Sequence, residues 1–510
     1  MRALLPRFIA ALKLWRPAFA DYRTHRRAIG FALAFLLCLG RHTISRAICT
    51  QQRQFRSWAP DYRLFSTCRW NPCALFDVVM DKVFVLMRKG QPLVAAMDDT
   101  ICRKTGKKIP GAKYLRDPLS PPFNTNLVWA LRFLHVALLI WPSRANAAAR
   151  AIPIAFQLAP PVAKPKPPKK KNFEKSASSA SEYRKALRKY KKDMKAYRRR
   201  QRTEGLSAQG AQMIRELRSR IDTRFPAWLK KLLWVVVDAS FCNSTVLPNL
   251  PERTVLIGRT RKDIALYAPI EDTKKGKGRK RKYGAALPTP EELRKDASVP
   301  WQICRIFAAG KTHNVRYKTL APVLWRSAAG ARPMCLIVVA PMSYRAHGHL
   351  LYRQPAYLLV SNPKISVTRA LQAYFYRWEI EADQKEEKDL LGVGQAQVWS
   401  EAAVSRQPAF HVAAYAALLA TAVETYGLNT KGASGSLPLW RKDKPPTRLS
   451  AGMLIARLRH ELDLCEANHS KKSPGRPWKK DREFQAAVVE QQIGMKLPVS
   501  IRAILDNAWT

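Results

Sequence analysis

The sequence of 510 residues predicts an α/β protein, and three observations support this fold class. Residues 1–89 have the apolar spacing of helices. Between residues 90 and 366, short apolar runs alternate with Gly, Pro and basic turn residues, which is typical of consecutive strands. From residue 367 onward the longer apolar spacing of helices returns.

Short apolar runs bounded by turn residues are the clearest strand candidates, and they comprise residues 92–97, 127–140, 152–158 and 232–237. After them we expect a β-rich insertion over 251–366, which contains a basic loop at 274–282. Helices are expected at 367–391, 408–426 and 453–464, with a polar gap at 430–446. These features divide the chain into regions 1–89, 90–250, 251–366, 367–427 and 428–510.

Residues 41–48 place Thr and Ser at a cap position before apolar residues, as in the second helix of a helix-turn-helix pair. This segment of the helical N-terminal region is therefore a candidate DNA-binding element. A plain helical bundle that packs on the next domain fits the same pattern.

A basic segment at 160–203 separates the third and fourth expected strands. It begins with a stiff Pro- and Lys-rich linker and continues as a helix rich in Lys, Arg and Tyr. Tyr183, Tyr190 and Tyr197 recur every seven residues and lie on one helical face. Contact with phosphates and an ordinary solvated helix both fit this composition.

The charge balance predicts an anionic partner, because 90 Lys and Arg face 37 Asp and Glu and leave a net charge of +53. Apolar runs are too short to span a bilayer, which needs about 20 residues, so we expect nucleic acid and no membrane. The nine cysteines form no CxxC pair, which disfavours a zinc module. We expect a soluble protein of the cytoplasm, associated with the nucleoid.

Carboxylates follow two of the expected strands. Asp98 and Asp99 come after the first apolar run, and Asp238 comes after the fourth. Carboxylates from neighbouring strand ends, joined by one from a helix, form a set of hard oxygen ligands suited to Mg²⁺. An Asp at the end of a strand is more commonly a turn or cap residue, so this pattern alone does not decide the role.

A helix face supplies the third element. Tyr374, Arg377, Glu381 and Lys388 are separated by 3, 4 and 7 residues, which places them within about 60° of one another on a helix. This stripe combines a metal-binding carboxylate with cations that can hold DNA phosphates. An exposed helix with ion pairs four residues apart is the alternative.

These residues resemble a known family. Residues 374–388 match the Y-x2-R-x3-E-x6-K signature of bacterial DDE transposases of the insertion-sequence type. Residues 97–100 are similar to the family's first-aspartate segment and residues 237–241 to its second. Residues 255–261 and 278–284 add further similarity, and together these segments span roughly residues 40–425.

The resemblance implies a ribonuclease H-like catalytic domain over 90–250 and 367–427, with the β-rich insertion between its parts. It implies Asp99, Asp238 and Glu381 as the metal-binding triad, with Asp98 as the alternative first ligand. It implies Tyr374, Arg377 and Lys388 as DNA contacts near the cut. The basic segment 160–203 is longer than the family pattern predicts.

The implied activity is transposition: binding of double-stranded terminal inverted repeats, cleavage there, and joining of the freed 3′-hydroxyls to target DNA. Two Mg²⁺ or Mn²⁺ ions serve this phosphodiester chemistry. Because two ends are handled together, a homodimer is expected in the synaptic complex. A non-catalytic DNA-binding protein derived from a transposase, and a ribonuclease H-like nuclease without strand transfer, are the alternatives.

Overall fold

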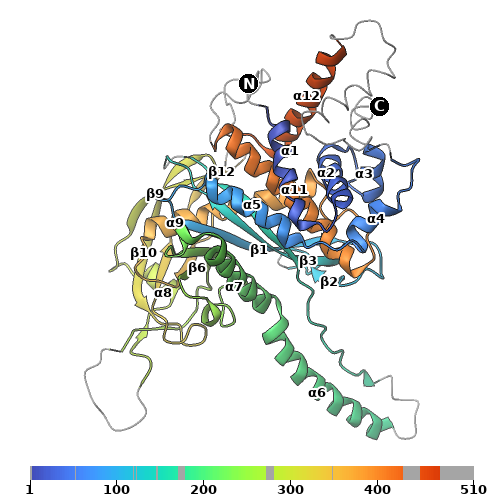
Figure 1. The fold of residues 1–510 in the computed structure, drawn as a ribbon. Helices are drawn as coiled ribbons and strands as arrows, with labels where there is room; N and C mark the ends of the chain where they lie inside the picture. The colour runs from blue at the N-terminus through green and yellow to red at the C-terminus, as the bar shows by residue number, and fades with distance from the viewer. Residues whose placement is uncertain are drawn as a thin grey trace. The chain divides into compact units, whose positions relative to one another are not determined.

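The computed structural model in Figure 1 describes residues 3–51, 53–118, 120–121, 123–144, 147–170, 179–270, 281–346, 349–428 and 448–470. Most of the expected basic loop at 274–282, the polar gap at 430–446 and the C-terminal residues 471–510 lie outside this part. The chain forms two compact units, one of residues 1–158, 305–314 and 371–510, the other of residues 159–304 and 315–370.

The first unit contains helices and one antiparallel group of strands. Its helices are α1 (Leu5–Lys13), α2 (Tyr22–Leu37), α3 (Ile44–Thr50), α4 (Ala59–Ser66), α5 (Pro72–Leu86), most of α9 (Val367–Tyr376), α10 (Trp378–Asp389), α11 (Glu401–Tyr426) and α12 (Ala451–Ser470). Its strands are β1 (Leu93–Arg103), β2 (Lys113–Arg116), β3 (Leu127–Ile140) and β4 (Arg150–Leu158).

Strand β3 is the centre of this sheet, with β1 on one side and with β2 and β4 both pairing on it. The β1–β3 pair is antiparallel, and its register places Asp98 opposite His135 and Asp99 opposite Leu134. The two aspartates therefore lie in the middle of β1, which continues to Arg103. The expectation that they end the strand was wrong, because the pairing with β3 continues past these polar residues.

Helix α11 is the core of the helical part. It is apolar on all sides and is buried over almost its whole length, and it packs against α5, α1 and β4. Phe410 on α11 stacks edge-on against Trp15, Phe35 and Phe65 of the N-terminal region. The helices of residues 1–89 thus share one core with the strands that follow them.

The second unit has its own strands and helices. They are α6 (Ser179–Glu204), α7 (Leu206–Arg224), β5 (Leu233–Val237), β6 (Thr254–Arg259), β7 (Leu266–Tyr267), β8 (Ala286–Leu287), α8 (Pro290–Lys295), β9 (Gln302–Ala308), β10 (Lys311–Val323), β11 (Met334–Val339), β12 (Ser343–Ala346), β13 (His349–Tyr352) and β14 (Ala356–Val360). The tip of the β9–β10 hairpin, residues 305–314, is grouped with the first unit.

The sheet of this unit has the order β5-β6-β14-β11-β10-β9. Strands β5 and β6 are parallel, with Val237 opposite Gly258, whereas β14 is antiparallel to both β6 and β11. Strand β6 begins the region expected to be an insertion, yet it pairs directly with β5. Helices combined with antiparallel and parallel strands confirm the mixed α/β class.

Among the helices described, none combines the length and the apolar composition that crossing a bilayer requires.

Candidate active site

The segment that carries the signature residues is two short helices in place of the one expected over 367–391. Helix α9 ends at Tyr376, and α10 begins at Trp378. Arg377 keeps helical backbone angles, but Ile380 N–H donates to its carbonyl oxygen at 3.0 Å, an i to i+3 bond that tightens the turn. The α-helical hydrogen-bond pattern is therefore interrupted at the arginine of the signature.

Arg377 joins two carboxylates. Its Nη1 lies 3.1 Å from Asp98 Oδ2 on β1, and its Nη2 lies 2.7 Å from Glu381 Oε1 one turn along α10. The arginine side chain is 9% exposed, against 15% for Asp98 and 32% for Glu381. Burial opposes the charge on Arg377, but Asp98 and Glu381 outweigh it and raise the pKa of the guanidinium. The structure thus places a fixed positive charge between two acids.

Asp99 lies on the other face of β1, because successive side chains of a strand point to opposite faces. Its Oδ2 is 3.3 Å from Nε of Arg132 on β3. Arg132 is opposite Ile101, two residues from Asp99 on the same face. Of the two aspartates weighed from the sequence, Asp98 and not Asp99 is brought to Glu381.

The remaining residues of the predicted stripe lie along the same contact between helix and strand. The guanidinium of Arg377 lies 5.8 Å from the ring centre of Tyr374. At the other end of α10, Lys388 lies near Cys102 and His135, since its charge shifts the pKa of both. Cys102 is on the same face of β1 as Asp98, so the stripe runs along this face of the strand.

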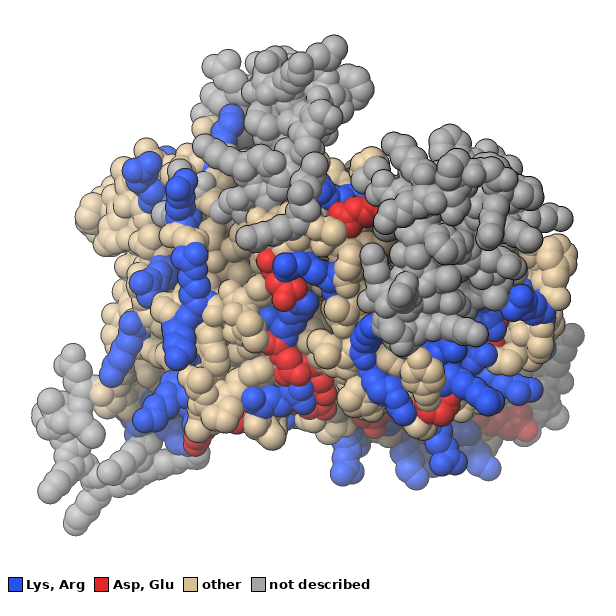
Figure 2. Space-filling view, turned by 45° about the horizontal axis from the view of Figure 1, so that its top comes forward, with Lys and Arg blue, Asp and Glu red and all other residues tan. Residues whose placement is uncertain are grey.

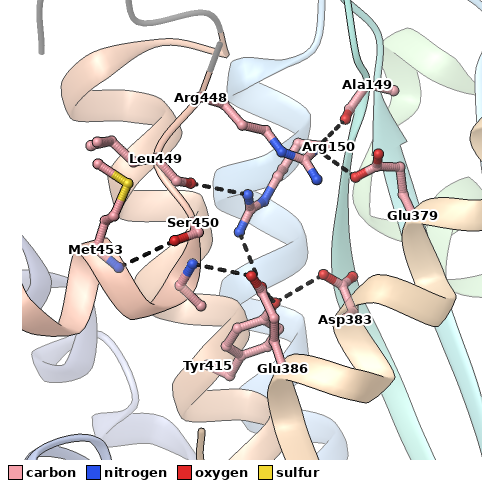
Figure 3. Close-up of polar contacts among 11 residues, drawn as sticks. Ala149, Arg150, Glu379, Asp383, Glu386, Tyr415, Arg448, Leu449, Ser450 and Met453 are labelled. Atoms are coloured by element: carbon pink, nitrogen blue, oxygen red, sulfur yellow. Dashed lines mark hydrogen bonds and ion pairs between the residues drawn. The ribbon is translucent and has the colours of Figure 1, made fainter. Parts of the chain in front are cut away.

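The opposite side of α10 is held by buried polar groups (Figure 3). The Tyr415 hydroxyl on α11 contacts Asp383 Oδ1 at 3.0 Å and Glu386 Oε2 at 2.5 Å. Arg150, at the start of β4, lies 3.7 Å from Glu386 and donates to the Leu449 carbonyl at 3.3 Å. These contacts connect α10 to β4, α11 and the beginning of α12.

Glu379 belongs to this second side, as the helical spacing predicts. Arg448 donates to Glu379 and, at 2.8 Å, to the carbonyl of Ala149, beside Arg150 on the chain (Figure 3). Burial raises the pKa of Asp383 well above its usual value, helped by the charges of Glu379 and Glu386 and opposed by Arg150. Burial therefore favours the protonated form of Asp383.

His135 and Glu387 meet in the interior between β3 and α10, with Nε2 and Oε1 3.5 Å apart. Burial, assisted by the charge of Lys388, lowers the pKa of His135 to about 3. Burial also raises the pKa of Glu387 well above its usual value. Burial thus favours the neutral form of both side chains, which opposes ion pairing between them.

Asp238 lies in the second unit, directly after β5. Its carboxylate accepts hydrogen bonds from the backbone N–H and the hydroxyl of Ser240, at 2.9 and 3.0 Å. The loop returns so closely that a Cβ on Gly258 would lie 2.7 Å from Cys242 Cβ. The absence of a side chain at Gly258 thus allows the turn that presents Asp238 at the end of β5.

Sequence reasoning missed the polar groups that hold α10. Arg150 and Tyr415 are single polar residues within apolar segments, and such residues are commonly paired in the interior. Arg132 and His135 likewise interrupt the apolar run 127–140. Polar residues within apolar runs therefore indicated buried polar contacts, but they did not indicate which residues these side chains contact.

Residues 41–48 form the start of α3, with the Thr43 hydroxyl capping Arg46 N–H at 3.1 Å. Ile44, Ala47 and Ile48 are buried, and His42 N–H donates to Gln395 Oε1 at 2.7 Å. These contacts agree with the packing alternative, and DNA recognition by this segment stays a prediction.

The side chains that contact Arg377 are of the type that binds a divalent cation. The carboxylate oxygens of Asp98 and Glu381 already contact one positive group, and carboxylate oxygens are preferred Mg²⁺ ligands. Within the described residues no group of three His, Cys, Asp or Glu side chains lies close enough to hold one ion. Asp98 and Glu381 are thus two candidate ligands of an incomplete set.

Comparison with known proteins supports nuclease chemistry. A family model described as "DDE superfamily endonuclease" matches residues 17–328, more than half of the chain. The comparison with curated proteins found no match to this chain. The matched residues include Asp98, Asp99 and Asp238 but end before α9, so the Y-R-E-K signature and the insertion-sequence type stay predictions. The expected DDE family is confirmed: this chain belongs to the DDE superfamily endonucleases.

Proposed function

We propose that this DDE endonuclease is a transposase, which cleaves DNA at the ends of its element and transfers the 3′-hydroxyl ends to target DNA. The observation that carries the proposal is the Asp98–Arg377–Glu381 cluster, which unites a strand carboxylate with two residues of the Y-x2-R-x3-E-x6-K pattern. The charge of +53 suits a DNA substrate. Lys and Arg cover much more of the face drawn in Figure 2 than Asp and Glu do.

The proposed fold of the catalytic domain is ribonuclease H-like. Three antiparallel strands in the order β4-β3-β1 include β1, which carries Asp98 and Asp99, and Asp238 lies between β5 and β6, which pair in parallel. The β-rich remainder of 251–366 separates Asp238 from the signature helices. This chain order supports the proposal, together with the family match.

The proposed metal ligands are Asp98, Asp238 and Glu381, for two Mg²⁺ or Mn²⁺ ions. Asp98 is proposed here in place of Asp99, because Asp98 shares Arg377 with Glu381. Asp238 is proposed on its sequence position at the end of an apolar strand. When bound, the divalent ions supply charge neutralisation at the scissile phosphate and activation of the attacking oxygen.

Arg377 acts, in this proposal, on the carboxylates and not on the DNA backbone. It offsets the repulsion between Asp98 and Glu381 and fixes both in position, at hydrogen-bond distance. Tyr374 and Lys388 remain the proposed DNA contacts, since both are only half-buried. The residues behind α10, Arg150 and Tyr415 among them, fix the helix that carries Glu381.

The test is a cleavage and joining assay with purified full-length protein. The substrate is a labelled duplex carrying the inverted repeats that flank the reading frame, and a supercoiled plasmid serves as target. Transposase activity predicts Mg²⁺-dependent nicks at the repeat ends together with labelled plasmid. Nicks without joined product would favour the nuclease without strand transfer, and end binding with no nicks would favour the non-catalytic protein.

A further inference from the structure

Helix α6 differs from every neighbouring element in its burial. None of its described side chains, residues 181–204, is buried, whereas the next helix, α7, buries seven residues. Figure 1 shows α6 as a long helix that extends away from α7. A helix without a buried face gains little stability from the rest of the protein. Its sequence is therefore free to serve a surface function.

The direction of α6 relative to α7 is fixed by the single residue between them. A Cβ on Gly205 would lie 2.3 Å from the carbonyl oxygen of Gln201, so only glycine allows this close turn. Gln209 of α7 donates from Nε2 to the carbonyl of Glu204 at 2.7 Å, which caps the end of α6. The two helices thus meet in a defined joint.

The less exposed side chains of α6 form one stripe, which consists of Tyr183, Ala186, Leu187, Tyr190, Asp193, Met194 and Tyr197. The apolar and aromatic members alternate at four- and three-residue intervals. This spacing is typical of a helix that lies along a partner over several turns.

The charge of α6 decides what kind of partner fits the stripe. The helix carries eleven Lys and Arg and three Asp and Glu, a net charge of +8. Arg184, Lys191 and Arg198 flank the stripe on one side, at the positions that face a second helix in a coiled coil. Two copies of α6, each with a net charge of +8, would repel each other, which disfavours self-association. A polyanion can contact the flanking cations with its charged groups and the tyrosine stripe with its less polar parts.

We propose that α6 is a DNA-binding arm that lies along duplex DNA with its tyrosine stripe and the flanking cations Arg184, Lys191 and Arg198. The choice of DNA among polyanions rests on the proposed function. With a rise of 1.5 Å per residue the helix is about 39 Å long, which is close to one turn of duplex, about 34 Å. Its cations make phosphate contacts, and its aromatic rings cover sugar edges.

The experiment measures binding of the full-length protein to a random-sequence 30-base-pair duplex by fluorescence anisotropy, without divalent ions and over a range of KCl. The test variant R184Q/K191Q/R198Q removes the cations beside the stripe. The matched control K185Q/K192Q/R199Q removes three exposed cations from the opposite face of the same helix. Circular dichroism confirms that both variants keep their helix content.

The proposal expects the test variant to bind more than about tenfold more weakly at 100 mM KCl. Its log–log salt slope should fall by about 2.7, since each phosphate contact contributes about 0.9. The control should change the slope by less than about 0.9, one contact. Equal losses of affinity in the two variants would show that DNA binding depends on the total charge of α6. This result would contradict the assignment of the tyrosine face as the DNA-binding side. If the test variant binds DNA with wild-type affinity, the proposal that α6 is a DNA-binding arm is wrong.

Other occupants give different results. A second copy predicts dimers that strengthen with salt and dissociate in Y190A/Y197A, because salt screens like charges, and this outcome overturns the DNA proposal. Tighter binding of duplex RNA than of duplex DNA overturns it as well. Cleavage is measured separately with Mg²⁺: a wild-type protein that binds through α6 but does not cleave would refute the proposed function and keep the arm.

Discussion

Asp98 and Asp99, consecutive residues of β1, are paired with different arginines on opposite faces of the sheet. Asp98 Oδ2 lies 3.1 Å from Arg377 Nη1, and Asp99 Oδ2 lies 3.3 Å from Arg132 Nε. The alternation of side chains along a strand thus separates two residues that the sequence presents as equivalent. We therefore propose Asp98, which shares Arg377 with Glu381 on α10, as the metal ligand.

The first prediction compares these two aspartates. Asp98→Asn should reduce Mg²⁺-dependent cleavage at least about 100-fold, because loss of a metal ligand exceeds the 10–100-fold effect of an outer partner. Asp99→Asn should keep cleavage within about tenfold and lose stability through Arg132. Initial rates on a labelled end substrate, with melting temperatures, provide the measurement. If Asp99→Asn loses more cleavage activity than Asp98→Asn, then Asp99 and not Asp98 is the metal ligand.

The second prediction compares two glutamates on α10. Glu381→Gln should eliminate cleavage, because a neutral amide is a poor ligand for a hard cation. It should also lower stability by about 1 kcal/mol, since it weakens the pair with Arg377. Glu379→Gln should keep cleavage but lower stability by about 1 kcal/mol, since it weakens the pair with Arg448. Equal loss of cleavage in both variants would show that the wrong side of the helix has been assigned.

The third prediction concerns Arg377 and Mg²⁺ without DNA. Arg377→Gln should lower the free energy of unfolding by about 1.5–3 kcal/mol, because it removes hydrogen bonds between charged groups. Mg²⁺ should then raise the melting temperature of this variant more than that of wild type, since Asp98 and Glu381 have lost their cation. Arg448→Gln, which removes an arginine from Glu379, is the control and should show no such gain. Identical Mg²⁺ responses in both variants would contradict the positioning role.

The fourth prediction concerns the support behind α10. Tyr415→Phe removes the hydroxyl from a buried oxygen of Asp383 and a partly buried oxygen of Glu386, and should destabilise the protein by about 1–3 kcal/mol. Tyr62→Phe, on a ring that is 40% exposed, is the control and should have an effect below about 0.5 kcal/mol. Denaturant unfolding measures both. A Tyr415→Phe effect as small as the control would show that these contacts do not fix the helix.

The fifth prediction concerns pH. Glu387, which faces His135 and Lys388 and lies near Asp383 and Glu386, has a pKa raised above its ordinary value of 4.5. A carboxyl group with a higher pKa in the folded chain than in the unfolded chain binds its proton more strongly when folded. The free energy of unfolding therefore falls as pH rises from 4.5 toward the raised pKa. The slope is at most about 1.4 kcal/mol per pH unit.

The variant Glu387→Gln should flatten this slope, because the amide carries no titrating proton. Wild type and variant should therefore have similar stability near pH 5, and the variant should be the more stable near pH 8. Urea unfolding at a series of pH values measures the difference. Parallel pH curves for the two proteins would show that Glu387 does not titrate in the folded chain above its ordinary range.

The sequence by itself determined most elements of this protein. Apolar runs predicted β3 over the residues that it occupies and β4 and β5 within two residues, because buried strands need continuous apolar side chains. The contact of Arg377 with Glu381 was part of the alternative for this helix, ion pairs four residues apart, since residues at that spacing are neighbours. The charge of +53 predicted a polyanionic partner before any fold was known.

Only the tertiary structure decided which aspartate meets the signature helix and what holds that helix from behind. Both depend on the register of β1 against β3 and on the approach of β4, α11 and α12, which are distant in the sequence from α10. Local periodicity specifies the faces of an element but not the partner of each face. Long-range packing makes that choice, and it places Arg377 between Asp98 and Glu381.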